Sequence, residues 1–194
     1  EKLKKGKKFL IGYVGVIGEQ EGLDLLLESA RYIVSQRKDV HFGIVGGGTH
    51  LDYIIQMCSD MGLEDYFDFY GRVDDKIMLE VLNTADICVN PDKPTAMNNL
   101  STMNKIMEYM ALKKPIVQYN LKEGKYSAKE ASLYATNTEP VDFAKKIIYL
   151  LDNPKIRIQM GEIGYNRVIN ELSWRFESKK LINLYQKVFN NNNI

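Results

Sequence analysis

The stretch Ser101–Val117, STMNKIMEYMALKKPIV, predicts a short helix that runs into a buried strand. At about 100° per residue, five apolar side chains fall on one arc and form a core-facing stripe: Met103, Ile106, Met107, Met110 and Ala111. Asn104, Lys105 and Glu108 fall together on the opposite side. The stretch therefore predicts a core helix whose polar face needs its own interpretation.

This polar face has two interpretations. Ser101 and Thr102 stand where an N-cap belongs, and free backbone N–H groups at a helix N-terminus attract anions. With Lys105 one turn in and Glu108 one turn further, the helix start could bind a phosphate and a hydroxyl group. The alternative is an ordinary amphipathic helix whose Lys105–Glu108 surface pair contributes about 0.2–0.5 kcal/mol. Helix physics alone leaves the two interpretations even.

The composition limits the class of protein. The chain has 194 residues and a formal net charge of +1, which fits one globular domain and argues against nucleic acid as the main partner. Cys58 and Cys88 lack the spacing of a zinc site and indicate buried thiols in a reducing compartment. No apolar run reaches the roughly 18 residues of a membrane span, and no signal peptide stands at the start. We therefore expect a cytoplasmic protein, and the start at Glu1 suggests a fragment of a longer one.

Strand and helix patterns alternate along the chain. The predicted strands are 9–14, 40–45, 66–70, 87–90, 115–119 and 132–134. The predicted helices are 22–35, 49–61, 74–83, the start of 101–117, 141–151, 156–169 and 174–189. Continuous apolar strands favour a parallel sheet covered on both faces, which predicts an α/β, doubly wound, Rossmann-like domain of about six strands. Ligands in such sheets bind beyond the carboxyl ends of the strands, where the strand order switches.

The two ends of the chain are predicted to stand apart from this domain, which spans 9–189. Residues 1–8 contain five lysines and form a basic linker, with contact to anionic lipid as the less favoured alternative. Residues 190–194 are asparagine-rich and are predicted to fray.

Two glycine-containing loops are candidate ligand contacts. The segment Gly46-Gly47-Gly48-Thr49 follows a strand and opens a helix, where glycine lets a backbone approach a ligand, although a plain tight turn explains it better. The segment Gly71-Arg72-Val73 follows the third strand. Arg72 either pairs with a phosphate or fixes the loop through a carboxylate such as Asp74.

Signatures of several other chemistries are absent from the sequence. There is no GK[ST], GxSxG or HExxH motif, and no Asp-x-Asp triplet that would hold a diphosphate through a metal. We interpret His41, in a strand, and His50, at a helix start, as structural. The sequence therefore predicts neither a metal site nor a cofactor.

Four segments, in this order, resemble the nucleotide-sugar half of a glycosyltransferase: VGVIGEQEGLDLLLESA, VHFGIVGGGTHLDYI, FYGRVDDKIMLEVLNTADICVNP and STMNKIMEYMALKKPIV. The resemblance is to the C-terminal domain of family 4 ("group 1") transferases of the GT-B fold. It covers about 9–189, including LLDNPKIRIQMGEIGYNRV and the helix that begins at Trp174. It implies one half of a GT-B protein, with an N-terminal acceptor domain outside this chain, toward which the last helix crosses.

The family signature implies particular site residues. Its second glutamate, which holds the donor ribose, falls on Glu108, whereas the first, which contacts the donor sugar, falls on Leu100. Basic residues that the family often carries for the diphosphate are replaced by Val16 and Glu21. A subgroup with STMNKIMEYM uses Lys105 instead, where an ammonium adds to the positive end of the helix dipole.

The resemblance implies a retaining, metal-independent transfer of a hexose from a nucleoside-diphosphate sugar to an acceptor hydroxyl, in surface polysaccharide or glycan synthesis. The acceptor is a glycan or a lipid-linked sugar, and the protein contacts the inner membrane face peripherally. Lys105 and Glu108 are the expected catalytic residues. The expected donor-binding set is Gly15, Gly46, Gly47, Gly71, Arg72, Val73, Ser101, Thr102, Met103, Asn104, Lys105 and Glu108. Two alternatives stay open: a non-catalytic nucleotide- or sugar-binding module of the same fold, and a doubly wound regulatory domain that binds a protein partner.

Overall fold

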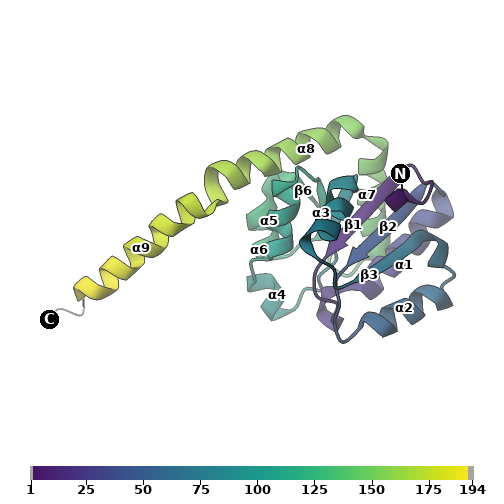
Figure 1. Cartoon of the computed structure of the whole chain (residues 1–194), viewed down its shortest axis with the longest axis horizontal. Helices are drawn as coiled ribbons and strands as arrows, with labels where there is room; N and C mark the ends of the chain where they lie inside the picture. Colours follow the sequence, from purple (N-terminus) through teal and green to yellow (C-terminus); the bar gives the residue numbers. More distant parts are fainter. Residues whose placement is uncertain (1, 192–194) are drawn as a thin grey trace.

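The computed structural model describes residues 2–191, which form a six-stranded sheet between two layers of helices (Figure 1). The strands are β1 (Phe9–Val14), β2 (Val40–Val45), β3 (Phe67–Gly71), β4 (Ile87–Asn90), β5 (Ile116–Tyr119) and β6 (Ser132–Ala135). Their order is β3-β2-β1-β4-β5-β6, and every neighbouring pair is parallel. The predicted doubly wound, Rossmann-like class is confirmed.

The helices alternate with the strands up to β6 and then close the fold. They are α1 (Leu23–Gln36), α2 (Leu51–Asp60), α3 (Asp75–Thr84), α4 (Ala96–Leu100), α5 (Asn104–Ala111), α6 (Lys122–Ala128), α7 (Pro140–Asp152), α8 (Pro154–Arg167) and α9 (Trp174–Asn191). A π-helical segment, Val168–Leu172, follows α8, and only Ser173 separates it from α9. Short 3-10 turns lie at Lys2–Lys4, Glu19–Glu21, Glu64–Tyr66 and Lys129–Ala131.

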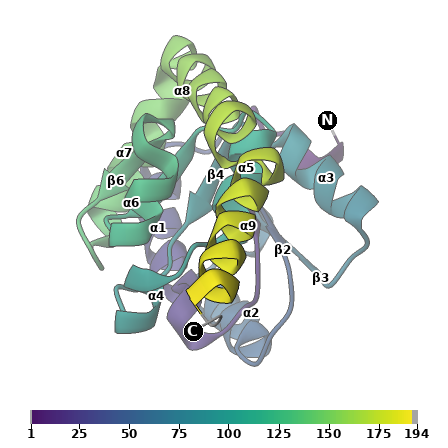
Figure 2. The same ribbon diagram turned by 90° about the vertical axis from the view of Figure 1, so that its left-hand side faces the viewer.

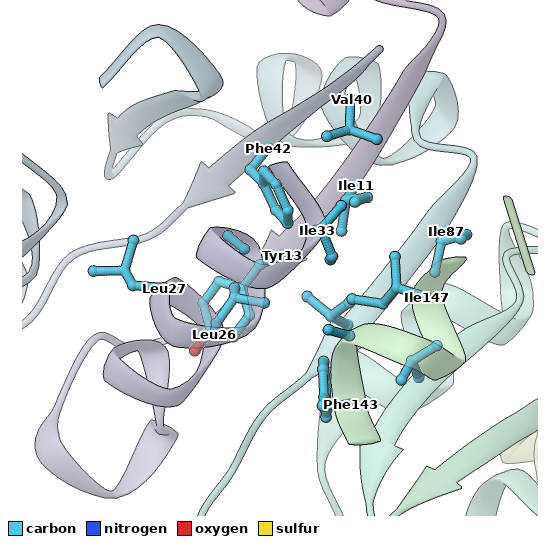
Figure 3. Packing of buried hydrophobic residues seen from close by; sticks show 14 of the residues in the cluster. Ile11, Tyr13, Leu26, Leu27, Ile33, Val40, Phe42, Ile87, Phe143 and Ile147 are labelled. Atoms are coloured by element: carbon cyan, nitrogen blue, oxygen red, sulfur yellow. The ribbon is translucent and has the colours of Figure 1, made fainter. Parts of the chain in front are cut away.

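Two apolar layers hold the sheet in place. Figure 3 shows the first layer, in which side chains from α1, α7, β1 and β2 interdigitate: Ile11, Tyr13, Leu26, Leu27, Ile33, Phe42, Phe143 and Ile147. The second layer joins α3 and α5 to the other face, through Leu10, Leu82, Cys88, Ile106 and Met110. Fully burying an apolar side chain of this size stabilises a fold by about 1.5–3 kcal/mol, so the apolar strand runs decide the architecture.

The strand order switches between β1 and β4. Gly12 of β1 lies opposite Gly43 of β2 on one side and opposite Cys88 of β4 on the other. From β1 the chain continues outward through β2 and β3, and then returns to β4 before adding β5 and β6. The loops that follow β1 and β4 therefore meet at one edge of the sheet, where ligands bind in this class of fold.

The first turn of α5 differs from the sequence prediction. The N-cap is Met103 rather than Ser101 or Thr102, and its side chain makes no capping hydrogen bond. The buried residues of α5 are Ile106, Tyr109 and Met110, whereas Ala111 is exposed. The buried face is thus rotated away from Ala111 toward Tyr109.

Two helices occupy segments that the sequence analysis treated as loops. These helices are α4, with five residues, and α6, with seven. Neither is long enough to show a helical stripe in the sequence.

The basic segment before β1 lies against the domain instead of forming the solvated linker that was predicted. Lys4 Nζ is 2.7 Å from Asp86 Oδ2, and Lys5 Nζ is 3.3 Å from Asp68 Oδ2. Leu3 packs against the second apolar layer. Glu1 lies outside the described residues.

The last helix, α9, extends away from the body of the domain (Figures 1 and 2). It includes Asn190 and Asn191, so the predicted tail does not begin at Asn190, and residues 192–194 lie outside the described part of the chain. Its large apolar side chains are exposed: Trp174, Leu181, Ile182, Leu184, Tyr185, Val188 and Phe189. Within residues 2–191, no helix is both long enough and apolar enough to cross a membrane.

Candidate functional site

A pocket of about 500 Å³ opens at the switch point of the sheet. It lies between the loop after β1 and the loop after β4, and its lining residues are Val16, Gly18, Glu19, Gln20, Glu21, Thr49, Lys93 and Thr95. Both loops lie at the carboxyl ends of the strands, where the sequence predicts that a ligand binds. The structure brings them together around one hollow.

Backbone hydrogen bonds join the loops after β1 and β2. Gly15 N donates to Val45 O (3.1 Å), and Ile17 N donates to Gly47 O (3.1 Å). Gly46 has a φ of +136°, and a Cβ there would lie 1.8 Å from Gly15 O. This glycine is therefore required by the close packing of two loops, which favours the tight-turn interpretation over a ligand-facing role for Gly46.

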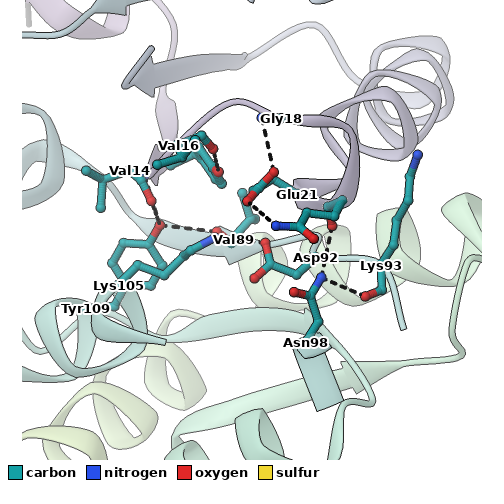
Figure 4. Close-up of polar contacts among 12 residues, drawn as sticks. Val14, Val16, Gly18, Glu21, Val89, Asp92, Lys93, Asn98, Lys105 and Tyr109 are labelled. Atoms are coloured by element: carbon teal, nitrogen blue, oxygen red, sulfur yellow. Dashed lines mark hydrogen bonds and ion pairs between the residues drawn. The ribbon is translucent and has the colours of Figure 1, made fainter. Parts of the chain in front are cut away.

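Lys105 forms a buried ion pair at this edge of the sheet (Figure 4). Its Nζ lies 2.8 Å from Asp92 Oδ1, and the two side chains are only 10% and 1% exposed. The Lys105 ammonium also stands 5.0 Å from the centre of the Tyr13 ring, and its Cε lies next to Gly15. The predicted Lys105–Glu108 surface pair is replaced by this pair with a residue that the sequence analysis did not single out.

Asp92 lies two residues after the end of β4, at the carboxyl edge of the sheet. Burial raises the pKa of its carboxyl, the Lys105 ammonium opposes that rise, and the nearby Glu21 carboxylate adds to it. The position of an acidic residue just after a strand was the available sequence signal. Only the tertiary contact with Lys105 distinguishes it from an ordinary polar loop residue.

Two tyrosine hydroxyls support the loop that follows β1. Tyr109 of α5 accepts a hydrogen bond from Val14 N (2.9 Å) and donates one to Val89 O (3.2 Å). Tyr13 donates to Val16 O (2.8 Å). Burial is the main reason that the pKa of both tyrosines lies well above the usual value, so both hydroxyls stay protonated.

Glu108 lies one turn after Lys105 on α5, and its side chain is exposed. Partial desolvation raises the pKa of its carboxyl, the Lys105 ammonium lowers it, and the Asp75 carboxylate raises it. The Lys105 ammonium thus acts on the Glu108 carboxyl without direct contact. No ion pair joins them in the described part of the chain.

The hydroxyls of Ser101 and Thr102 are used locally. Ser101 Oγ donates to Met97 O (2.7 Å), and Thr102 Oγ1 donates to Glu123 Oε1 (2.9 Å). Because α5 begins at Asn104, the first helical N–H groups belong to Asn104 and Lys105 and not to Thr102 and Met103. The N-terminal end of the helix is thus displaced toward Lys105.

The Gly71-Arg72-Val73 segment lies at the same edge, after β3. Gly71 has a φ of +64°, and its carbonyl accepts a hydrogen bond from Gly46 N (2.8 Å). Arg72 is exposed, with its aliphatic stem against Gly47. Asp74 does not fix Arg72: its side chain accepts from Ile77 N (2.9 Å) and caps α3.

Of the three departures from the family signature, Val16 and Glu21 line the pocket, and Leu100 ends α4. Glu21 turns back into its own loop, where Oε2 accepts from Gly18 N at 3.0 Å. Val16 and Leu100 are 58% and 73% exposed. An acidic and two apolar residues thus stand where the family's basic residues and first glutamate are expected.

Asn98 of α4 is a further structural residue that the sequence analysis missed. It is buried, and its Nδ2 donates to Gln20 O (3.1 Å) and to Lys93 O (2.9 Å). Lys93 Nζ in turn lies 2.8 Å from Asp24 Oδ2. These contacts fix the two walls of the pocket relative to each other.

The fold and this edge define a doubly wound α/β domain with a buried Lys105–Asp92 ion pair at its switch point. The chain belongs to the glycosyl transferases group 1 family, whose model matches residues 8–153. The expected fold, that of the C-terminal half of GT-B glycosyltransferases, is confirmed.

Two comparisons with proteins of S. aureus agree with this family assignment. The chain is 24% identical over 181 residues to the poly(ribitol-phosphate) alpha-N-acetylglucosaminyltransferase of Staphylococcus aureus (strain COL), which covers 91% of this chain and 35% of that protein. A structure of a mutant TarM from S. aureus, in complex with fondaparinux, alpha-GlcNAc-glycerol and UDP, matches with a TM-score of 0.80 at 23% identity, over 94% of this chain and 36% of that one.

A separately crystallised domain matches over almost its whole length. The C-terminal domain of the group 1 family protein LpcC from Francisella tularensis has a TM-score of 0.72 at 19% identity, over 88% of this chain and 92% of that one. This chain spans about a third of the two longer S. aureus proteins.

Proposed function

We propose that this chain is the donor-binding domain of a retaining glycosyltransferase, which transfers a hexose from a nucleoside-diphosphate sugar to an acceptor hydroxyl during surface polysaccharide or glycan synthesis. Family membership supports the reaction class. The observation that carries the proposal is the Lys105 ammonium, held at the start of α5 by Asp92 at the carboxyl edge of the sheet.

Lys105 and the first N–H groups of α5 would stabilise the diphosphate. A departing nucleoside diphosphate gains negative charge, and preorganised donors in a partly buried site stabilise that charge strongly. The positive end of the helix dipole acts in the same direction as the ammonium. With these groups in place, we propose that the reaction needs neither a bound metal nor another cofactor.

Glu108 would hold the ribose. Its exposed carboxylate can accept two charge-assisted hydrogen bonds from vicinal hydroxyls. The backbone of 71–73, at the same edge of the sheet, would face the base. Lys105 and Glu108 would thus serve different parts of one nucleotide.

The exposed apolar face of α9 supports a two-domain protein. Its side chains would pack against an N-terminal acceptor domain that binds the glycan or lipid-linked sugar. Closure of two domains over both substrates would then be required for turnover, so this chain alone should bind the donor without transferring sugar.

The location of the protein is also part of the proposal. Cys58 and Cys88 are both free and buried, which suits a reducing compartment. We place the protein in the cytoplasm, in peripheral contact with the inner membrane face, where a lipid-linked acceptor would be available.

Nucleotide titration tests the function directly. Calorimetry and thermal shift with UDP, GDP, ADP, their sugars and their nucleosides should identify one base that binds. Lys105→Met should weaken the diphosphate by about 1.5–3 kcal/mol and the nucleoside hardly at all, because only the diphosphate contacts the ammonium. The matched control is Lys113→Met, which removes an exposed lysine paired with Glu162. Failure of every nucleotide and nucleotide sugar to bind would refute the proposal.

The exposed Leu100 is the observation that supports an alternative function. A side chain without a polar group, where the family contacts the donor sugar, favours a non-catalytic nucleotide-binding module of the same fold. Such a module would bind a nucleotide and its sugar with equal affinity, because nothing contacts the hexose. A domain that binds only a protein partner would ignore both.

A further inference from the structure

Asp92 carries a carboxylate that is almost completely buried. Its side chain is 1% exposed at the carboxyl end of β4, and Lys105 Nζ at 2.8 Å is the cation that faces it (Figure 4). A carboxylate taken out of water is costly unless a partner compensates it. The ionised state of Asp92 therefore depends on Lys105.

The other groups around Asp92 do not supply positive charge. The Glu21 carboxylate approaches from the 3-10 turn after β1 and repels it. Tyr13 of β1 and Tyr109 of α5 present neutral hydroxyls, and Asn90 of β4 contributes a neutral amide. The adjacent Lys93 is paired with Asp24, 2.8 Å away.

A diphosphate bound at Lys105 would change this balance. Two further negative charges would share the ammonium that now compensates Asp92, within a few ångströms and in a region of low dielectric constant. Like charges in one site favour protonation of a carboxyl group. Burial already raises the pKa of Asp92, and the added negative charge would act in the same direction.

We propose that Asp92 is a proton-coupled positioning residue: it holds Lys105 in place in the free domain and takes up one proton from solvent when a nucleoside-diphosphate sugar binds. The proton adds to a carboxylate oxygen of Asp92, no other bond changes, and Lys105 is left as an uncompensated cation facing the diphosphate. This inference rests on the proposed donor-binding function. It adds a pH dependence that the function alone does not require.

The test is calorimetric titration of the 194-residue chain with UDP-glucose, or with the sugar of whichever base binds, in two buffers of different ionisation enthalpy. Phosphodiesters stay ionised over pH 6–9, unlike the terminal phosphate of UDP, which titrates near pH 6. The buffer-dependent heat should report about one proton taken up per nucleotide sugar. The affinity should rise by up to about tenfold for each unit fall in pH between the pKa of Asp92 in the complex and its lower pKa in the free domain, and should not change with pH outside that range. The nucleoside alone should take up none through this route.

Asp92→Asn provides the decisive variant, because it keeps a hydrogen-bonding group beside Lys105 and removes the titration. It should bind the nucleotide sugar at every pH without proton uptake. Glu162→Gln is the control, because it removes an exposed carboxylate that is paired with Lys113 away from this edge, and it should take up the proton as the unmodified chain does. Uptake that persists in Asp92→Asn overturns the inference.

Titration of the unmodified chain in the two buffers also decides the question, so the test does not depend on the folding of a variant. Binding with no buffer dependence overturns the role of Asp92 and leaves the donor-binding function standing. Absence of binding by any nucleotide sugar refutes the proposed function, and this inference with it.

Discussion

The hydroxyl of Tyr109 accepts a hydrogen bond from the backbone N–H of Val14 at 2.9 Å. The bond joins α5, which carries Lys105 and Glu108, to the last residue of β1. Because the same hydroxyl donates to Val89 O at 3.2 Å, it also reaches β4. One fully buried side chain thus connects the helix of the proposed site to both strands at the switch point.

Removing the Tyr109 hydroxyl should destabilise the contact between α5 and the strands β1 and β4. In Tyr109→Phe, Val14 N loses its partner in a buried place, so the free energy of unfolding should fall by about 1–3 kcal/mol. Urea denaturation measures the change. The control Tyr126→Phe alters an exposed ring and should stay within about 0.5 kcal/mol. Equal stability of the two variants would show that the Tyr109 hydroxyl is not energetically coupled to β1.

Lys105 should be important for stability as well as for binding. Lys105→Ala leaves the Asp92 carboxylate buried without a cation, and losing one partner of a buried pair typically costs about 3–5 kcal/mol. This cost is far larger than the roughly 0.2–0.5 kcal/mol that a Lys105–Glu108 surface pair would contribute. The measurement is the unfolding free energy at pH 7.

Two comparisons separate this effect from a loss of packing. The cost of Lys105→Ala should shrink as pH falls, because protonation of Asp92 removes the unpaired charge. The double variant Asp92→Asn/Lys105→Met has no charge to leave unpaired and should be more stable than Lys105→Ala at pH 7. A cost for Lys105→Ala that does not depend on pH would contradict this account.

The strands were predictable from the sequence because each is a continuous apolar run, and such runs have one stable place in a parallel sheet. The orientation of α5 was less predictable. Its five-residue apolar stripe suggested that Ala111 faces the core, but the structure buries Tyr109 in its place. A tyrosine counts as apolar only when its hydroxyl finds a partner, and that partner, Val14 N, is 95 residues away.

The same rotation explains why Asp92 was not singled out. Turning α5 toward Tyr109 carries Lys105, one turn earlier on the same side, into the fold, where it meets Asp92. Neither residue carries a local signal of burial. The donor-binding residues suggested by the family resemblance, such as Glu108 and Arg72, stay predictions until a nucleotide is titrated.

His41 should give the domain a pH-dependent stability that is unrelated to the donor site. It is buried in β2, with Nε2 3.2 Å from Asp68 Oδ2. Burial lowers the pKa of its imidazole, although Asp68 opposes the shift. Because the folded pKa lies below the unfolded value of about 6.5, the contribution is complete above that pH and is lost as pH falls toward the folded pKa.

Thermal unfolding between pH 8 and 4.5 measures this effect. The unmodified chain should lose stability below about pH 6.5, and His41→Asn should flatten that part of the profile. The control is Asp39→Asn, because the Arg37 guanidinium lowers the pKa of Asp39 and its contribution is lost only at more acidic pH. An unchanged slope in His41→Asn would assign the pH dependence to other groups.

Glu108 should make nucleoside binding pH-dependent. As the proposed acceptor for the ribose hydroxyls, Glu108 binds best when it is ionised. Desolvation raises the pKa of its carboxyl, the Lys105 ammonium lowers it, and the Asp75 carboxylate raises it. Nucleoside affinity should therefore fall as pH drops through the pKa of Glu108, and Glu108→Gln should bind more weakly and show no such drop. Lys105→Met removes the group that lowers this pKa and should move the transition to higher pH. Because a nucleoside carries no phosphate, titration of Asp92 does not contribute, and calorimetry of the three proteins with one nucleoside across pH 4.5–8 isolates Glu108. A transition that survives in Glu108→Gln would mean that another group holds the ribose.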